Sequence, residues 1–176
     1  MAECSCPEKP GEPTVARCPR NGSIGTGVDR QTVKGLLTEE ALRRLTPSDY
    51  RFCADADCDV VYFDANGSCF GTRDIRVQVW HKHPFGDRPM CYCFGESEVS
   101  IRREIQTTGT SSAVERIREH IAAGRCACKI RNPRGACCLG DMIAAIKRVE
   151  GALRSEVAAG EALGDIHAGQ RDFLDR

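Results

Sequence analysis

The sequence lacks three features that would point to familiar classes of protein. Lys+Arg 25 and Asp+Glu 25 cancel to a formal net charge of zero, so the chain has no surplus of positive charge with which to neutralise the phosphates of a nucleic acid. No apolar run approaches the roughly 18–20 residues that cross a bilayer, and the strongest run is Val60–Phe63. The polar, proline-bearing start has no apolar core of the secretory kind. We therefore expect a cytoplasmic protein that binds no nucleic acid and inserts into no membrane.

Several catalytic and redox motifs are missing as well. No Cys-x-x-Cys occurs in the 176 residues, which excludes thioredoxin-type motifs, most zinc ribbons and the Cu(I)-binding loop of heavy-metal-associated modules. The chain also has no Ser-His-Asp set, no glycine-rich phosphate loop and no pair of catalytic carboxylates. Gly25-Thr26-Gly27 is expected to be a turn. Any activity is thus expected only through bound metal, as metal-ion reduction or electron transfer.

What the chain has in excess is cysteine. Twelve of the 176 residues are Cys, far above ordinary usage, and such density indicates either disulfides or thiolate ligands. Because glutathione keeps structural disulfides rare in a reducing cytosol, we interpret the thiols as metal ligands. Along the sequence they form a pair, a set of four and a set of six: Cys4 and Cys6; Cys18, Cys53, Cys58 and Cys69; Cys91, Cys93, Cys126, Cys128, Cys137 and Cys138.

These sets follow a predicted division of the chain. Hydrophobic patterning changes near Asp87–Pro89 from short β-type runs to helices, which predicts an α+β fold in which a small β-rich domain (15–88) precedes a helical domain (89–150). Residues 1–14 are rich in Pro, Glu and Gly and are expected to be a flexible tail. Residues 151–176 are expected to be a C-terminal helical extension that frays.

In the first domain, apolar residues recur at helical spacing from Thr32 to Leu45, which fits one helix or two short ones. Three β-type runs follow at 50–53, 60–63 and 75–80. Asn66-Gly67 between such runs predicts a hairpin turn.

In the second domain, three helices are predicted. Ser97 is expected to cap the first, which ends at Gly109. The spacing from Ser112 to Glu115 predicts a capping box that opens the second, and the third begins after Cys138.

A zinc site is predicted in the first domain. Cys53 and Cys58 bracket a turn between two strands, so both thiolates converge on one ion, and Cys18, just before the Asn21-Gly22 turn, is the natural third ligand. Structural Zn(II) takes four tetrahedral ligands. The fourth stays open among Asp57, Asp59, Cys69, a tail cysteine and a histidine. His81 and His83 form a further pair of potential ligands, although we expect that pair to be exposed polar residues rather than a metal site.

The second domain favours a 2Fe-2S cluster over a second zinc. Cys91-Tyr92-Cys93 precedes a pair of predicted helices, Cys126-Ala127-Cys128 follows it, and Cys137-Cys138 precedes the third helix. Such a cluster needs four thiolates on loops whose backbone N–H groups point at the sulfurs. Loops at helix N-termini supply these donors.

Longer segments of the sequence resemble a known family. They are Tyr50–Phe63, Cys91–Gly95, Gly124–Cys128, Asn132-Pro133 and Cys137–Asp141. In order, across about residues 18–148, they are similar to the N-terminal domain of CopZ-type copper chaperones. The helical half also resembles bacterioferritin-associated ferredoxin, which carries Cys-x-x-Cys as its second pair. The resemblance implies a cytoplasmic protein with one Zn(II) and one redox-active 2Fe-2S cluster that handles soft metal ions, Cu(I) among them. Its implied partner is a metal-transporting ATPase or a copper chaperone.

Two departures from the family bear on the sites. Relatives named copper chaperones usually carry a C-terminal heavy-metal-associated module, which these 176 residues lack. Some relatives have Cys-Pro-x-Cys where this sequence has Cys18-Pro19-Arg20-Asn21, so no cysteine ligand carries over to position 21.

The resemblance carries Cys91 and Cys93 over as cluster ligands. Adjacent Cys137 and Cys138 project in different directions, so one of them is expected to bind. We predict Cys128 and Cys138 as the second pair, with Cys126 and Cys137 as alternates. The alternative function is a metal-binding scaffold or sensor of a heavy-metal resistance system, without electron transfer.

Overall fold

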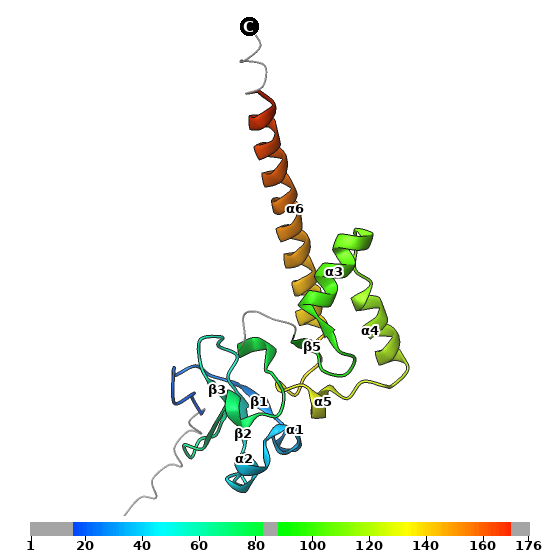
Figure 1. Cartoon of the computed structure of the whole chain (residues 1–176). Coiled ribbons are helices and arrows are strands. Elements are labelled where there is room, and N and C mark those ends of the chain that lie inside the picture. Colours follow the sequence, from blue (N-terminus) through cyan, green and yellow to red (C-terminus); the bar gives the residue numbers. More distant parts are fainter. Residues whose placement is uncertain (1–15, 83–87, 170–176) are drawn as a thin grey trace, which may run out of the picture.

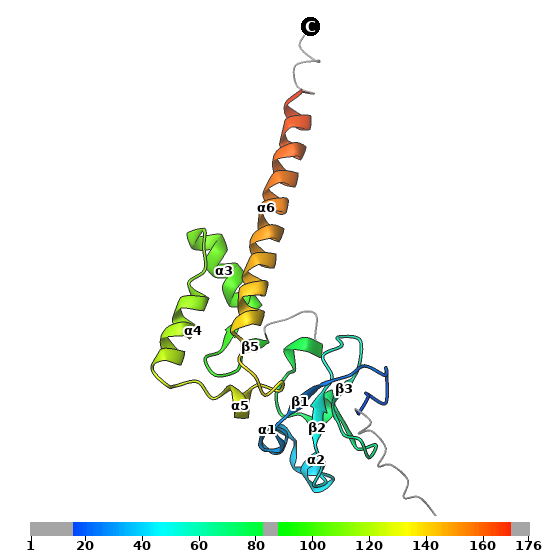
Figure 2. The same cartoon turned by 180° about the vertical axis from the view of Figure 1, so that it is seen from behind.

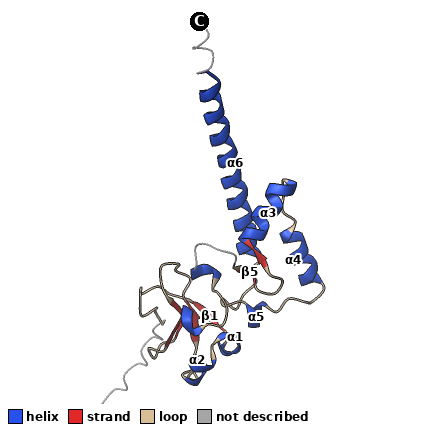
Figure 3. Cartoon of the chain, in the orientation of Figure 1, coloured by secondary structure: helices blue, strands red, loops and turns tan. Residues whose placement is uncertain are grey.

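Apolar side chains of two short helices cover one face of an antiparallel sheet in the N-terminal half, and a second group of helices packs around one long helix in the C-terminal half (Figure 1). The computed structural model describes residues 16–82 and 88–169, with side chains described as far as Val157. The elements are β1 (Thr26–Val28), α1 (Arg30–Leu36), α2 (Glu39–Arg43), β2 (Tyr50–Phe52), β3 (Val60–Phe63), β4 (Cys69–Gly71), β5 (Pro89–Cys91), β6 (Glu96–Ser97), α3 (Glu98–Thr108), α4 (Ala113–Ala122), α5 (Cys128–Arg131) and α6 (Leu139–Gly169). The expected α+β class is confirmed (Figure 3).

The N-terminal sheet has the order β1-β2-β3-β4, and all neighbouring strands are antiparallel. The predicted hairpin is confirmed, because β3 and β4 pair across a turn in which Gly67 has φ +87°. Every residue of β3 is buried. Val61 and Tyr62 join the core under α1 and α2, whereas Val60 and Phe63 pack against cysteines. Strand β3 therefore contributes to both the hydrophobic core and the cysteine cluster.

Two strand predictions were wrong. Residues 75–80 form no strand; Ile75 makes only an isolated bridge to Leu37, and a short 3-10 turn begins at Trp80. Thr26–Val28, expected to be part of a turn, is β1 and pairs with β2. Gly25 precedes it where a Cβ would lie 2.5 Å from the carbonyl oxygen of Phe52, so only glycine fits that close approach of two backbones.

The helical run of residues 32–45 is two short helices rather than one. Leu37 is extended at the end of α1, and the Thr38 side chain accepts a hydrogen bond from the N–H of Ala41 as the N-cap of α2. One helix and two short helices both fit the apolar spacing. The Thr38 cap, which begins a new helix after the extended Leu37, decides for two.

The C-terminal half contains the three predicted helices and a β5–β6 hairpin that patterning did not reveal. Ser97 caps α3, and Gly109 ends it with φ +85°, as expected. The capping box at Ser112 was wrong, because Ser112 makes no side-chain cap and its hydroxyl donates to Glu104 instead. Figure 2 shows α3 and α4 against the first turns of α6, whose backbone continues as a helix to Gly169.

The two halves meet through α5 and the loop after it. The Tyr62 hydroxyl of β3 donates to the carbonyl of Pro133 at 2.8 Å, and the Thr32 hydroxyl of α1 donates to the carbonyl of Lys129. Gly135, with φ +67°, lies against Val28 and Thr32. Residues of β1, α1 and β3 thus hold α5, which begins at Cys128, and the loop that follows it. In the described part of the chain, no helix is long and apolar enough to cross a membrane.

An ion-pair network fixes the helices of the second half. Arg116 of α4 donates two hydrogen bonds to Glu104 of α3, at 2.8 and 3.1 Å, and also pairs with Glu96 at 2.8 Å. The hydroxyls of Ser111 and Ser112 donate to the same Glu104 carboxylate. The Arg116 hydrogen bonds, with help from both serines, hold the pKa of Glu104 far below its ordinary range. Glu104 therefore links α3 to α4 while it is ionised.

We predict that Glu104→Gln lowers the free energy of unfolding at pH 7 by about 1–2 kcal/mol, since hydrogen bonds to charged groups contribute on that order. Because the pKa of Glu104 is lower in the folded protein than the unfolded value of about 4.3, ionised Glu104 stabilises the folded state fully above that pH. This stabilisation is lost as the pH falls toward and through the folded-state pKa. The variant should therefore lose less stability than the parent on acidification below about pH 4.3. Urea unfolding across pH measures both effects. Glu115→Gln is the control, because exposed Glu115 contacts Arg118 only at 3.8 Å; an equal loss in both variants would contradict the network.

Candidate metal centres

The three cysteines predicted to hold zinc converge in the N-terminal half. The sulfurs of Cys18, Cys53 and Cys58 all lie within 4.8 Å of one another, and all three residues are buried. Cys18 Sγ and Cys58 Sγ are 3.7 Å apart. A tetrahedral ion with Zn–S bonds of about 2.3 Å spaces its sulfurs by about 3.8 Å. The donor type and the spacing fit Zn(II).

Backbone turns present these thiols. Cys18 begins a tight turn in which its carbonyl accepts from the N–H of Gly22 at 2.8 Å and its own N–H donates to Ser23 at 2.9 Å. Gly22 has φ +71°, which glycine adopts without strain. Cys53 follows β2 and Cys58 precedes β3, so the β2–β3 connection supplies the other two sulfurs. Val60 and Phe63 pack against the group.

Polar groups surround Cys53 in particular. Burial alone raises the pKa of this thiol, but the backbone N–H of Asp55, the Ser23 hydroxyl and the charge of Lys82 lower it on balance. The Ser23 oxygen is 3.7 Å from Cys53 Sγ, and Asn21 Nδ2 is 3.8 Å from it. By contrast, burial raises the pKa of Cys58 to about 11. The surroundings of Cys53 therefore favour its thiolate form.

Lys82 places a positive charge beside the same group. Its side chain is only 6% exposed, and its Nζ donates to the carbonyl of Asp55 at 2.6 Å. A buried ammonium is costly without negative charge nearby. Thiolates at the neighbouring cysteines supply that charge.

None of the described residues proposed as fourth ligand joins the three sulfurs. Asp57 is exposed, Asp59 pairs with Arg20 at 3.3 Å, and Cys69 is exposed on β4. His81 lies instead 3.9 Å from Asp141, with its ring against Phe52. The tail cysteines Cys4 and Cys6, and also His83, lie outside the described residues.

The second centre gathers cysteines from three segments. The sulfurs of Cys93, Cys126 and Cys128 lie within 4.8 Å of one another, with Cys93 and Cys126 half-buried and Cys128 buried. Cys128 Sγ is 3.8 Å from Cys93 Sγ and 3.2 Å from Cys126 Sγ. The Cys91–Cys93 hairpin and the start of α5 therefore face each other.

Two further thiols adjoin this group. Cys91 and Cys138 are almost fully buried and share a hydrogen bond. This bond from Cys138, with the backbone N–H groups of Phe94 and Cys93, lowers the pKa of Cys91 to about 6, and the same bond raises the pKa of Cys138. The backbone N–H of Cys138 also bonds to Cys128. Cys93, Cys126 and Cys128 thus form the close group of sulfurs, and Cys91 and Cys138 adjoin it as a buried pair.

Backbone donors point at these sulfurs. The N–H of Ala127 donates to Cys93 Sγ at 3.3 Å, and Cys91 and Cys128 receive the N–H groups just described. Cys137, by contrast, is exposed beside buried Cys138, which agrees with the expectation that the two neighbours project differently. Such donors temper the charge of thiolates around a cluster.

Tyr92 ties the second centre to the first half. Its hydroxyl accepts from the N–H of Trp80 at 2.8 Å and donates to the carbonyl of Gln78 at 3.0 Å. Because Tyr92 stands between Cys91 and Cys93, this anchor fixes the hairpin that carries both thiols.

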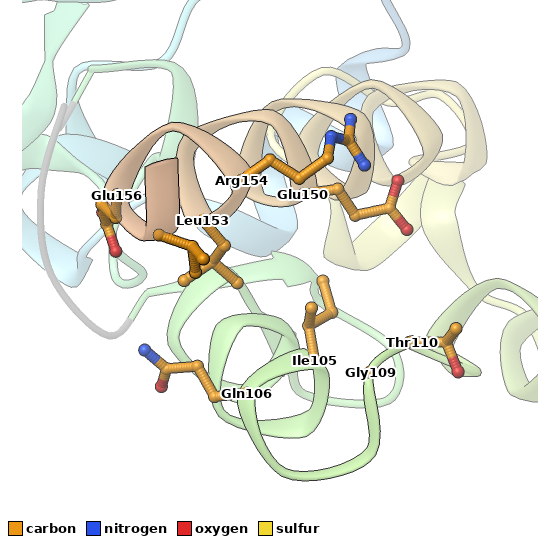
Figure 4. Close-up of a pocket in the computed structure, with 9 residues that line it drawn as sticks. Ile105, Gln106, Gly109, Thr110, Glu150, Leu153, Arg154 and Glu156 are labelled. Carbon is orange, nitrogen blue, oxygen red and sulfur yellow. The ribbon is translucent and has the colours of Figure 1, made fainter. Parts of the chain in front are cut away.

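A groove of about 860 Å³ lies apart from both centres, between α3 and α6. Ile105 and Leu153 face one another across it, and Val157 contributes to the same wall (Figure 4). No cysteine or histidine is among the described residues that line it. The groove therefore has no ligand for a soft metal.

Sequence reasoning missed the residues around the zinc triad. Asn21, Ser23 and Lys82 carry no motif of their own, and Lys82 stands between two histidines in a stretch that patterning assigned to the surface. The one available signal was Asn21, at the position where some relatives have a cysteine.

Comparisons with known proteins agree with this geometry. Residues 15–76 match a family model named for CopZ and described as a zinc binding domain. The chain is 30% identical over 125 residues to the copper chaperone CopZ of Archaeoglobus fulgidus, covering 70% of this chain and 58% of the relative. It therefore spans less than two thirds of that relative. The X-ray structure of the A. fulgidus CopZ N-terminal domain is similar with a TM-score of 0.57 and 28% identity, over 70% of this chain and 92% of that one. The resemblance to the N-terminal domain of CopZ-type proteins is confirmed.

Proposed function

Residues 15–76 belong to the CopZ-type zinc-binding domains, and from that premise we propose that the protein is a two-centre metalloprotein that handles soft metal ions. Zn(II) is held by Cys18, Cys53 and Cys58 in the first half. A 2Fe-2S cluster is held in the second half. The observation that carries the proposal is the grouping of cysteines at two places: Cys18, Cys53 and Cys58 in the first half, and Cys93, Cys126 and Cys128 in the second, with Cys91 and Cys138 paired nearby.

The zinc centre stabilises the first half in this proposal. Its three sulfurs come from the turn before β1 and from the β2–β3 connection, which are far apart in the sequence. An ion that joins them closes long loops and supplies folding free energy, as in other small metal domains. The buried packing of Val60 and Phe63 against these cysteines depends on the same closure.

We assign the cluster to Cys91, Cys93, Cys128 and Cys138. Cys93 and Cys128 are in contact, Cys91 and Cys138 pair beside them, and backbone N–H groups donate to Cys91, Cys93 and Cys128. Cys126 contacts the set beside Cys128, and Cys137 is exposed. When bound, a 2Fe-2S cluster supplies one-electron chemistry. Of the four cysteines that would hold the cluster, Cys91, Cys128 and Cys138 are buried from solvent and Cys93 is half-buried.

We further propose Cu(I) as the cargo and the reducing cytoplasm as the compartment. Thiolates bind soft ions such as Cu(I) preferentially, and they persist where disulfides are kept reduced. The choice of copper among soft ions rests on the name of the A. fulgidus relative, which is a copper chaperone. The partner proposed with it is a metal-transporting ATPase or a copper chaperone that carries the Cu(I) loop missing from these residues.

The cluster assignment predicts a sharp division among the cysteines of the second half. Cys91→Ser, Cys93→Ser, Cys128→Ser and Cys138→Ser should each lose iron, sulfide and the visible and electron paramagnetic resonance signals of the purified protein. Cys126→Ser and Cys137→Ser should keep them. A normal spectrum from Cys128→Ser with loss in Cys126→Ser would show that the second pair is assigned wrongly; a normal spectrum from Cys91→Ser would remove the assignment altogether.

Removal of zinc should unfold the first half. We expect a chelator, or Cys53→Ser, to lower the Tm by ~10 °C or more, because the ion supplies much of the folding free energy of such domains. Calorimetry measures the shift, and elemental analysis measures the zinc. Cys69→Ser is the matched control, since Cys69 is exposed on β4 and lies outside the sulfur group. An unchanged Tm in the zinc-free protein would contradict a structural role.

A redox measurement separates electron transfer from a scaffold or sensor role. We expect a reversible midpoint potential for the holoprotein, and stoichiometric formation of Cu(I) when the dithionite-reduced, desalted protein meets Cu(II). The cluster-free Cys91→Ser variant should form much less Cu(I) and so controls for reduction by free thiols. Irreversible loss of the cluster on reduction would instead favour the scaffold.

A further inference from the structure

The fourth corner of the zinc site is the part that the family resemblance leaves unassigned. Cys18 and Asn21 stand at the two ends of one tight turn, closed by the Gly22 N–H on the Cys18 carbonyl. A turn of this form brings its first and fourth side chains to one ion in zinc sites with Cys-x₂-Cys spacing. The chain has the turn but places an amide where the second thiolate would stand.

The Asn21 amide is held in an orientation that does not suit a ligand. Its Oδ1 accepts from the N–H and the hydroxyl of Ser23, at 3.1 and 2.8 Å. Its Nδ2 donates to Asp55 Oδ2 at 2.7 Å and lies 3.8 Å from Cys53 Sγ. Rotating the amide by 180° would place Asn21 Oδ1 against the Asp55 carboxylate and Asn21 Nδ2 against the backbone N–H of Ser23. Both contacts would be repulsive. The group therefore presents donors, not a lone pair, to the sulfur cluster.

Charge and exposure agree with a missing protein ligand. One Zn(II) and three thiolates carry a single net negative charge, which the buried ammonium of Lys82 balances. Asn21 is exposed while the three cysteines are buried, so the corner it occupies faces solvent.

We propose that the zinc centre has three ligands, all from the described part of the chain, and keeps its fourth position open to small molecules from solution, with small thiols as the class it binds best. The inference rests on the proposed zinc site. It gives that site a property that closed structural zinc sites lack, because an open position is typical of zinc that exchanges ligands. On thiol binding a Zn–S bond forms, the solvent ligand leaves and the thiol proton passes to solvent, with no change of oxidation state.

Zinc K-edge absorption spectroscopy on the full-length protein tests the proposal, since it counts sulfurs at zinc separately from those at iron. In thiol-free buffer with a phosphine reductant, we expect three sulfurs and one lighter atom. Addition of 2-mercaptoethanol should raise the count to four. Asn21→Cys should show four sulfurs in both buffers, and Cys4→Ser with Cys6→Ser should match the parent.

Other outcomes overturn the proposal in distinguishable ways. Four sulfurs in thiol-free buffer that fall to three in the Cys4→Ser, Cys6→Ser variant would show that the tail supplies the ligand. Four sulfurs that persist in that variant would identify another cysteine of the chain. A count of three that 2-mercaptoethanol leaves unchanged would show a closed site. Absence of zinc from the purified protein would overturn the zinc assignment itself, and the open position with it.

Discussion

Close packing of several thiol sulfurs is the constraint on which the rest of the structure depends. In each half three sulfurs lie within 4.8 Å of one another, fully buried in the first half and partly buried in the second, so they repel one another once they ionise and require donors, cations or a metal. The chain meets this need differently in its two halves. Around Cys53 it uses a lysine and two polar side chains, whereas around Cys91 and Cys93 it uses backbone N–H groups. The first device supplies a full charge, and the second supplies dipoles fixed by the fold.

The two centres share one supporting frame. β3 buries Val60 and Phe63 against the first sulfur group, and Tyr62, next to Phe63, holds the Pro133 carbonyl beyond α5. The Tyr92 hydroxyl binds the backbone on either side of Val79 and so fixes the Cys91–Cys93 hairpin. Strand β3 therefore contacts both the first sulfur group and the segment that follows α5.

Sequence reasoning predicted what depends on residue type and failed where a distant partner decides. The proximity of Cys18, Cys53 and Cys58, the Asn66-Gly67 turn and the Ser97 cap follow from local chemistry, and the structure has each of them. Thr26–Val28 carries almost no apolar signal and becomes a strand only because β2 lies beside it. Residues 75–80 have the pattern of a strand but no partner strand, apart from one bridge at Ile75. Ser112 has capping spacing, yet the Glu104 carboxylate captures its hydroxyl.

The turn from Cys18 to Gly22 places Asn21 beside the sulfur group, and the hydrogen bonds of its amide determine what the side chain does there. The likeness to CopZ-type domains identifies which segment approaches the metal, because the turn at Cys18 is a property of the backbone. It does not determine what the fourth side chain does there. The hydrogen bonds of the amide decide that question: with its oxygen committed to Ser23 and its nitrogen to Asp55, Asn21 stabilises charge on Cys53 from outside the coordination sphere. The same turn with an altered side chain thus places an amide, rather than a fourth sulfur, beside Cys53.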